Sequence, residues 1–492
     1  MEAIMYQIDF RKPIAIHFIG IGGISMSGLA EILMQEGFRI SGSDAHESEL
    51  TDHLASAGAK VMYGQAAANI TDDIDLVVYT AAVHADNPEY AEVVRRGIPM
   101  MSRAELLGQI MKNYGEAIAV TGTHGKTTTT SMLTEILLAA EKNPTISVGG
   151  ILHSIGGNIR VGGPELFVTE ACEYTNSFLS FFPTMEIILN IEADHLDFFK
   201  DLDDIRHSFR LFAQKLDEKG LLIINRDIKN YEEICGGLPC KVVTFGHSAE
   251  SDYSAAEITY DAFARPAFTV MEQGKKAGTI TLGVPGEHNV YNALAAIAAA
   301  KALAIPDEAI AEGLLHFTGT DRRFEKKGEL NGITIIDDYA HHPQEITATL
   351  KAAKNYPHKK LWCVFQPHTY TRTKAFLDEF AEALSAADAV VLADIYAARE
   401  TDTLGISSAD IASRIEKLGS EVHYFPSFEE IEAPEIEKEC NVSLESAVDT
   451  SNNTGFVLKY GKNSYLVRDT ALDSILETAK IKGAALTRMP QY

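Results

Sequence analysis

A lysine and two threonines follow a glycine-containing turn close to residue 120. Residues 121–128 read Thr-Gly-Thr-His-Gly-Lys-Thr-Thr, after an apolar run at 117–120 and before apolar residues at helical spacing. A turn between a buried strand and a helix N-terminus directs backbone N–H groups and the helix dipole at one point, which favours a phosphate chain. Lys126 can reach the terminal phosphates and the Thr127 hydroxyl can ligate Mg²⁺. An ordinary strand–helix turn with a solvated lysine is the weaker alternative. The candidate ATP-binding residues of this turn are Gly122, Thr123, His124, Gly125, Lys126, Thr127 and Thr128.

A second glycine-rich turn follows the apolar run at 14–19. Gly20 and Gly22 occupy the first two positions of a dinucleotide-binding fingerprint, whereas Ser25 stands where a third Gly or Ala is usual. Asp44 lies at about the distance expected of a ribose-binding carboxylate. The turn favours a ligand that contains a diphosphate. A hydride-transfer enzyme and plain helix–strand packing by glycine are the alternatives.

Carboxylates and a histidine follow two further candidate strands, in residues 166–173 and 186–197. Residues just past the C-terminal ends of parallel strands face the ligand crevice of an open α/β sheet. Mg²⁺ prefers oxygen ligands, so Glu173 is a candidate ligand, and His195 is a less usual one. Asp194 and Asp197, in the second cluster, could instead serve as helix caps.

Three later candidate strands each end in a polar cluster. The strands lie at 333–336, 361–365 and 389–393, and the clusters at 337–343, 366–373 and 394–400. Any one cluster could be caps and turns, but three in succession indicate one crevice that is lined repeatedly.

Two polar features precede these strands. Asn292 lies a turn inside an Ala-rich helical stretch, where asparagine is a poor helix former. It is either a ligand contact or a tolerated surface residue. Arg322 and Arg323 lie in a linker at 317–324, where they are either solvated or placed to stabilise charge on a transferring phosphoryl group.

The length and composition of the chain indicate what kind of protein holds these residues in place. The 492 residues predict two to four α/β domains, and 46% hydrophobic with 23% charged residues is ordinary for a soluble globular protein. The net charge of −26 argues against a nucleic-acid partner. No membrane span or signal peptide is evident, and the five scattered cysteines predict no disulfide framework or zinc site, which fits a cytoplasmic protein. In the tail, a turn is expected at 452–455, a hairpin at 455–467 and a helix at 471–484.

Taken together, these motifs resemble those of the Mur ligase family over about residues 13–430. The resemblance implies an α/β, three-domain protein. A Rossmann-like N-terminal domain at 1–112 would hold a UDP-sugar, and a P-loop-type central ATPase domain at 113–321 would hold ATP. A Rossmann-like C-terminal domain at 322–492 would help to bind an amino acid, with an atypical tail after about 430. The chain departs from the family pattern at Ser25 and at Cys172, which stands where an aspartate is usual.

The implied chemistry joins L-alanine to the carboxylate of UDP-N-acetylmuramate through an acyl phosphate, in peptidoglycan precursor synthesis. ATP and Mg²⁺ are the implied cofactors, and a monomer or weak homodimer without nucleic-acid or membrane partners is expected. Three alternatives remain: a relative that adds a peptide or another amino acid, a dehydrogenase, and a non-catalytic nucleotide-binding homologue.

The resemblance also implies roles for individual residues. The catalytic candidates are Lys126, His195, Arg323 and Arg372. Asn292 and Arg323 join the ATP-binding residues, and the metal candidates are Thr127, Glu173 and His195. The UDP-sugar candidates are Gly20, Gly22, Gly23, Ser25, Ser27, Asp44, Thr80, His342 and His368.

Overall fold

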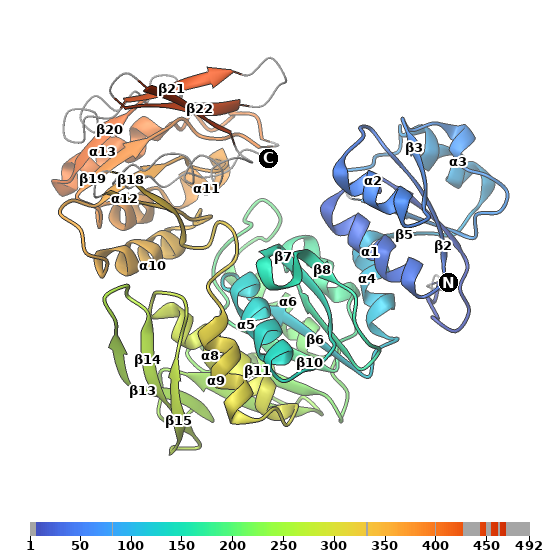
Figure 1. Ribbon diagram of the computed structural model, residues 1–492, viewed down its shortest axis with the longest axis horizontal. Coiled ribbons are helices and arrows are strands. Elements are labelled where there is room, and N and C mark those ends of the chain that lie inside the picture. Colours follow the sequence, from blue (N-terminus) through green and yellow to red (C-terminus); the bar gives the residue numbers. More distant parts are fainter. Residues whose placement is uncertain are drawn as a thin grey trace.

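The computed structural model describes residues 6–80, 82–330, 333–398 and 400–426, together with the backbone of three strands between 443 and 468. Figure 1 shows three α/β bodies in chain order, with the first at the right, the second below and the third at the upper left. The predicted α/β architecture of three domains is confirmed.

The first body is a parallel sheet in the order β3-β2-β1-β4-β5, with helices packed against it. Its central strand is a continuous buried run, as expected of a parallel strand covered on both faces. The strands are β1 (Ala15–Ile19), β2 (Arg39–Asp44), β3 (Lys60–Tyr63), β4 (Leu76–Tyr79) and β5 (Met100–Ser102). The helices are α1 (Ile24–Gln35), α2 (Glu49–Ser56), η1 (Ala67–Asn69), α3 (Pro88–Arg96) and α4 (Arg103–Met111).

The second body is a ten-stranded sheet in the order β15-β14-β13-β12-β11-β10-β6-β9-β7-β8. Strand β6 pairs in parallel with both β10 and β9, so its C-terminal end opens onto the crevice between two neighbours. The strands are β6 (Glu116–Thr121), β7 (Thr145–Leu152), β8 (Gly157–Arg160), β9 (Leu166–Glu170), β10 (Met185–Ile188), β11 (Leu221–Asn225), β12 (Lys241–Gly246), β13 (Tyr253–Tyr260), β14 (Pro266–Glu272) and β15 (Lys275–Thr281). The helices are α5 (Lys126–Ala139), η2 (His153–Ile155), η3 (Tyr174–Ser180), α6 (Leu202–Ala213), α7 (Glu232–Cys235), α8 (His288–Ala302) and α9 (Asp307–His316). Helices α8 and α9 pack against α5, so the helix that begins at Lys126 is held on its far side by an Ala-rich buried surface.

The third body differs from the sequence expectation in one respect. The first of the three predicted strands does not join the other two in a described ladder. It pairs antiparallel with the preceding segment after a short connection. The elements are β16 (Glu325–Leu330), β17 (Ile333–Asp337), α10 (Pro343–Lys354), β18 (Trp362–Phe365), α11 (Tyr370–Ala375), α12 (Leu377–Leu384), β19 (Ala389–Leu392), α13 (Ser408–Leu418) and β20 (Glu421–Tyr424). Strands β18, β19 and β20 form the parallel sheet.

The tail contains three antiparallel strands, β21 (Ser443–Val448), β22 (Thr454–Tyr460) and β23 (Asn463–Arg468). The predicted hairpin is confirmed by the pairing of β22 with β23. The helix expected at 471–484 lies outside the described residues, as do residues 452–453 of the expected turn, whereas residues 454–455 begin β22.

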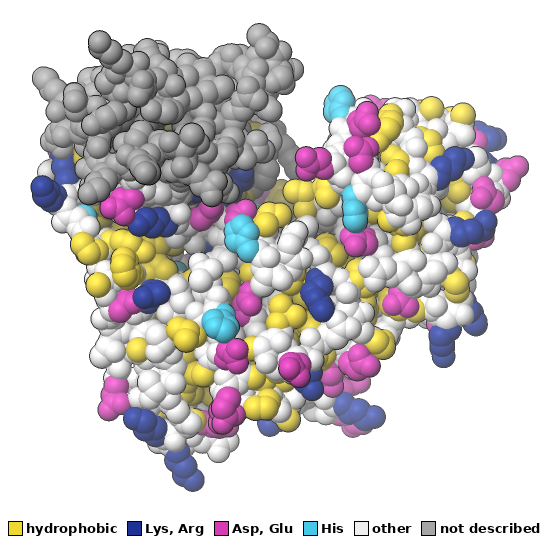
Figure 2. Space-filling model, in the orientation of Figure 1, with side chains coloured by type: hydrophobic (Ala, Val, Ile, Leu, Met, Phe, Trp, Pro, Cys, Tyr) yellow, Lys and Arg dark blue, Asp and Glu magenta, His cyan; other side chains and the backbone are white. Residues whose placement is uncertain are grey.

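Acidic and basic side chains are interspersed on the face of the molecule shown in Figure 2. No helix in the described part of the chain is long and apolar enough to cross a membrane.

A carboxyl group without a partner lies inside the central sheet and predicts a pH-dependent stability. Glu186 on β10 is fully buried, neither carboxyl oxygen has a hydrogen-bond partner among the described residues, and burial raises its pKa well above the usual value against the opposing effect of Lys215. The folded state therefore holds a proton that the unfolded state releases, and stability falls as pH rises above the ordinary carboxyl pKa. We expect Glu186→Gln to raise the melting temperature by about 2 °C or more near pH 8. The gain should shrink toward about pH 4.5, where the unfolded carboxyl is also protonated; parallel melting curves across this range would contradict the assignment.

A glycine on α4 allows the first and second bodies to approach closely. A Cβ at Gly108 would lie 1.9 Å from the backbone oxygen of Ser180, which cannot move independently of its chain. We expect Gly108→Ala to destabilise the protein by about 1–3 kcal/mol, as overpacking typically does. Urea unfolding measures the change. The matched control is Gly157→Ala, because a Cβ there meets no described atom within 4 Å, and equal effects at the two sites would show that the contact is not the cause.

Candidate active site

The phosphate loop lies between β6 and α5, where the sequence predicted it. Gly125 precedes the first helical residue with a φ of +84°, and a Cβ there would lie 2.6 Å from Oδ1 of Asn292. The ammonium group of Lys126 donates to the carbonyl oxygens of Gly122 and Thr123, and its Nζ lies 3.0 Å from Oε2 of Glu173. The loop thus curls around its own lysine, and Asn292 contacts the loop. Asn292 is buried, so the alternative that it is a surface residue is wrong.

Two carboxylates from the end of β9 face the start of α5. The Thr127 hydroxyl donates to Oε2 of Glu170 at 3.1 Å, and Glu173 is buried beside Lys126. Nε2 of His195 lies 3.7 Å from Oε1 of Glu173. His195 has a φ of 52°, an uncommon conformation for a residue with a side chain, and its ring lies over Tyr174 at 4.5 Å between centroids. A hydroxyl and two carboxylates form an oxygen-rich donor set, which fits Mg²⁺.

An ion pair joins the second and third bodies beside this cluster. Arg372 on α11 donates through Nη2 and Nε to Oδ1 of Asp194 at 3.0 and 3.2 Å, and its Nη1 lies 3.2 Å from Nδ1 of His368. Although burial opposes ionisation, Arg372 and His195 hold the pKa of Asp194 well below its usual range. Asp194 is therefore not a helix cap. The cap of α6 is Asp201, seven positions further on by the printed sequence.

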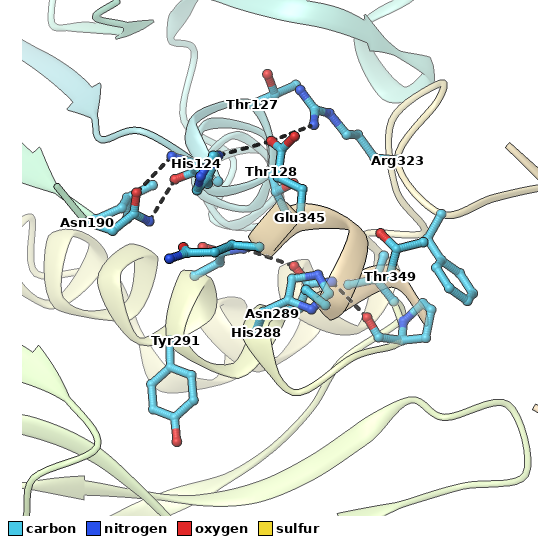
Figure 3. Close-up of a pocket in the computed structure, with 18 of the residues that line it drawn as sticks. His124, Thr127, Thr128, Asn190, His288, Asn289, Tyr291, Arg323, Glu345 and Thr349 are labelled. Atoms are coloured by element: carbon cyan, nitrogen blue, oxygen red, sulfur yellow. Dashed lines mark hydrogen bonds and ion pairs between the residues drawn. The ribbon is translucent and has the colours of Figure 1, made fainter. Parts of the chain in front are cut away.

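A second contact between these bodies centres on Glu345 of α10. Nδ1 of His124 lies 3.1 Å from Oε1 of Glu345, and Nη1 of Arg323 lies 3.9 Å from the same oxygen. Figure 3 shows this row of side chains, together with the paired hydrogen bonds between Asn190 and the backbone of His124. Burial opposes the charged form of His124, but Glu345 and Glu192 raise its pKa to about 9. Sequence reasoning did not select Glu345; its only local signal is its place three residues after His342, in a capping box.

In the part of the chain that the structure describes, three cavities are found at the boundary between the second and third bodies, among others. One of about 350 Å³ runs from the phosphate loop past Asn289, Asn292 and Arg323. A second, of about 340 Å³, is lined by Lys126, Thr127, Glu170, His195, Arg323, His341, Gln366, His368, Arg372 and Tyr396. A third, of about 460 Å³, lies between Tyr174, His195, Arg372 and Tyr396. The three polar clusters of the third body therefore do reach one crevice, as predicted, even though β17 lies in a separate ladder.

Partial or full burial lowers the pKa of three histidines in the third body. His341, His342 and His368 each have a pKa lowered to about 4, so these imidazoles are neutral near neutral pH. His342 lies with its ring 4.8 Å from that of His124, and His368 lies against Arg372.

The glycine-rich turn of the first body is also formed as expected. The Gly22 N–H donates to Oδ2 of Asp44 at 2.8 Å, and a Cβ at Gly22 would collide with that carboxylate. The Ser25 hydroxyl lies 3.0 Å from Nη1 of Arg103, a cation that sequence reasoning did not select. Gly23 caps α1 without a side-chain hydrogen bond. The remaining UDP-sugar candidates divide between bodies: Gly20, Ser27 and Thr80 lie in the first, and His342 and His368 lie in the third. Their shared role in binding a sugar nucleotide stays a prediction.

Comparison of the sequence with models of known protein families identifies the class of protein to which this fold and crevice belong. Residues 15–115 match the model described as Mur ligase family, catalytic domain, residues 120–300 the Mur ligase middle domain, and residues 322–441 the Mur ligase, glutamate ligase domain. The chain belongs to the Mur ligase family.

Within the family, the similarity points to one member. The chain is 65% identical over 429 residues to a UDP-N-acetylmuramate–L-alanine ligase of Lachnospira eligens, which covers 87% of this chain and 94% of the relative. It is similar in structure to UDP-N-acetylmuramate-alanine ligase MurC of Thermotoga maritima, with a TM-score of 0.70, 29% identity, and coverage of 97% of this chain and 96% of that one. A murein peptide ligase of Psychrobacter arcticus is 25% identical with a TM-score of 0.63, and the match covers 97% and 95% of the two chains.

Proposed function

We propose that this protein is an ATP-dependent ligase that joins L-alanine to the carboxylate of UDP-N-acetylmuramate, in peptidoglycan precursor synthesis in the cytoplasm. The carboxylate takes the terminal phosphoryl group of ATP, and the alanine amine then displaces phosphate from the acyl phosphate. The observation that carries the proposal is the cavity of about 340 Å³ that the phosphate loop shares with Arg323, Arg372 and the Glu170 carboxylate of β9.

The residues of that cavity suit phosphoryl transfer between two bound substrates. Such a transition state spreads negative charge over the transferred group, and catalysis requires positioning and positive charge more than a protein nucleophile. In this proposal Lys126 and Arg323 supply the charge, and Asn292 supports the loop that holds the phosphates. Thr127, Glu170 and Glu173 would hold Mg²⁺, which supplies further positive charge at the phosphate oxygens. Lys126 turns from its own loop carbonyls toward the phosphates when ATP is present.

The second substrate requires a separate binding surface. The first body offers N–H groups at the start of α1 for a diphosphate, and Arg103 lies beside Ser25 at the same turn. His195 lies next to Glu173, where it can accept a proton from the alanine ammonium group before attack. Arg372 is the proposed partner of the alanine carboxylate.

The closest alternative is a ligase that attaches a peptide to the same sugar nucleotide. The murein peptide ligase of Psychrobacter arcticus shares the fold, but its identity of 25% is far below the 65% of the alanine-adding relative. The cavity of about 460 Å³ beside Arg372 is the region in which the two activities would differ.

The deciding experiment measures phosphate release with each substrate omitted in turn. We expect release only when ATP, Mg²⁺, UDP-N-acetylmuramate and L-alanine are all present, and loss of activity when EDTA removes the metal. A panel of other amino acids and an L-alanyl tripeptide serves as the control for specificity. Release without the sugar nucleotide, or preference for the tripeptide, would overturn the proposal.

A further inference from the structure

Three buried side-chain atoms converge beside the phosphate loop. Nε2 of His124, a carboxylate oxygen of Glu192 and a ring nitrogen of His342 all lie within 4.8 Å of one another. Among the described residues, all three atoms are shielded from solvent. Nε2 of His342 has no hydrogen-bond partner, whereas Nε2 of His124 and Oε2 of Glu192 face each other as an ion pair. Buried polar atoms are rarely left without partners, so the unpartnered Nε2 of His342 beside a buried imidazole and carboxylate calls for a ligand that all three can share.

The geometry at His124 and Glu192 matches two ligands of a single ion. Nε2 of His124 lies 3.3 Å from Oε2 of Glu192. Two ligands at bond lengths of about 2.0–2.1 Å on a tetrahedral ion are separated by about 3.4 Å. The other ring nitrogen of His124, Nδ1, lies 3.1 Å from a carboxylate oxygen of Glu345. Glu345 holds the proton on Nδ1, so Nε2 is the nitrogen that can bind an ion, as in carboxylate–histidine–metal arrangements. A bound ion takes the place of the Nε2 proton that otherwise faces Glu192.

His342 completes the cluster from the third body. Only 3% of this residue is exposed, and its ring lies 4.8 Å from the ring of His124. Its Nδ1 accepts from the N–H of Gln344 at 3.4 Å, which is long for a hydrogen bond. Coordination through Nε2 moves the ring proton to Nδ1 and forfeits only this weak contact.

We propose that His124, Glu192 and His342 bind a divalent transition-metal ion of the zinc class, with a fourth position open to water. Two imidazoles and one carboxylate suit such an ion, whereas the oxygen donors around Thr127 suit Mg²⁺. Two of the ligands come from the second body and one from the N-terminus of α10 in the third. The ion therefore binds when these bodies are closed, and it fixes the phosphate loop in the closed arrangement.

The test is a titration of the metal-free, full-length protein with Zn²⁺ in competition with a chromophoric chelator. We expect one tight ion per chain, and we expect Co²⁺ in its place to show the intense visible absorption of a tetrahedral site. His124→Ala and Glu192→Gln should each weaken Zn²⁺ binding about tenfold or more, since even the loss of an outer-shell partner costs 10–100-fold. His342→Ala should do the same from the other body. Melting curves confirm that each variant is folded, and Glu192→Gln serves if a histidine variant is not.

Two controls identify the site. His316 on α9 is largely exposed, so His316→Ala should leave Zn²⁺ affinity unchanged. His195→Ala should also leave it unchanged, because His195 belongs to the Glu173 cluster. Equal affinity in the wild type and in all cluster variants would show an adventitious ion only. Loss of binding in His195→Ala but not in the cluster variants would assign the ion to the Glu173 cluster. Either result overturns the proposal.

Discussion

Replacing Lys126 with methionine is expected to lower kcat by about a hundredfold or more while leaving the protein folded. The methionine side chain keeps most of the volume of the lysine stem but cannot place a positive charge on the transferring phosphoryl group. Removing a single donor to developing transition-state charge typically lowers kcat by about 10²–10³-fold. Steady-state phosphate release with saturating substrates measures the change, and a near-normal kcat would refute the assignment.

The stability of this variant requires its own control. Burial opposes the charged form of Lys126, yet Glu173 keeps its pKa above the ordinary lysine value, so the two groups form a buried ion pair. Removing one partner of such a pair typically costs about 3–5 kcal/mol. The double variant Lys126→Met with Glu173→Gln removes both charges and should regain part of that stability without regaining activity. Lys142→Met, at an exposed position, should change neither property.

Arg372→Ala is expected to raise the KM for L-alanine by about 30-fold or more, with a much smaller change in the KM for ATP. Truncating one partner of a buried charge pair at a binding surface costs about 2–5 kcal/mol. Arg372→Lys should restore little, because an ammonium group cannot reproduce the two-pronged contact of a guanidinium with a carboxylate. Equal effects on the two KM values would count against a role at the amino acid.

The partner of Arg372 supplies a matched variant. Asp194→Asn keeps the arginine but removes the ion pair that joins the second and third bodies. If Arg372 binds the alanine carboxylate, Asp194→Asn should affect both KM values to a similar extent. If Asp194→Asn instead raises the KM for L-alanine selectively, as expected for Arg372→Ala, then the arginine acts through Asp194 rather than on the amino acid.

Local sequence signals predicted most of the framework and the phosphate loop. The glycine-rich turns after β1 and β6, the lysine at the start of α5 and the carboxylates after β9 each depend on residues close together in the chain. Periodicity and turn chemistry report such short-range features well. The hairpin of β22 and β23 was found by the same reasoning.

The contacts that the sequence did not predict join distant residues. Glu345 meets His124 across 221 positions, and Asp194 meets Arg372 across 178. Nothing in the spacing near Asp194 distinguishes an interdomain ion pair from a helix cap. Strand β17 was expected to line the same crevice as β18 and β19, and it does so from a separate antiparallel ladder with β16, a pairing that the sequence did not predict.

The packing at Gly28 shows that the two outer domains are attached to the central one by different forces. A Cβ at Gly28 would lie 2.1 Å from Cγ1 of Ile159, so α1 and β8 interlock through apolar surface without space for an added methyl group. The third domain touches the centre through the rings of Phe263 and Tyr356, but its contacts there also include ion pairs at Asp194 and at Glu345. Dissolved salt screens charges that become exposed on opening but hardly weakens apolar contact. Rising ionic strength should therefore loosen the attachment of the third domain more than that of the first.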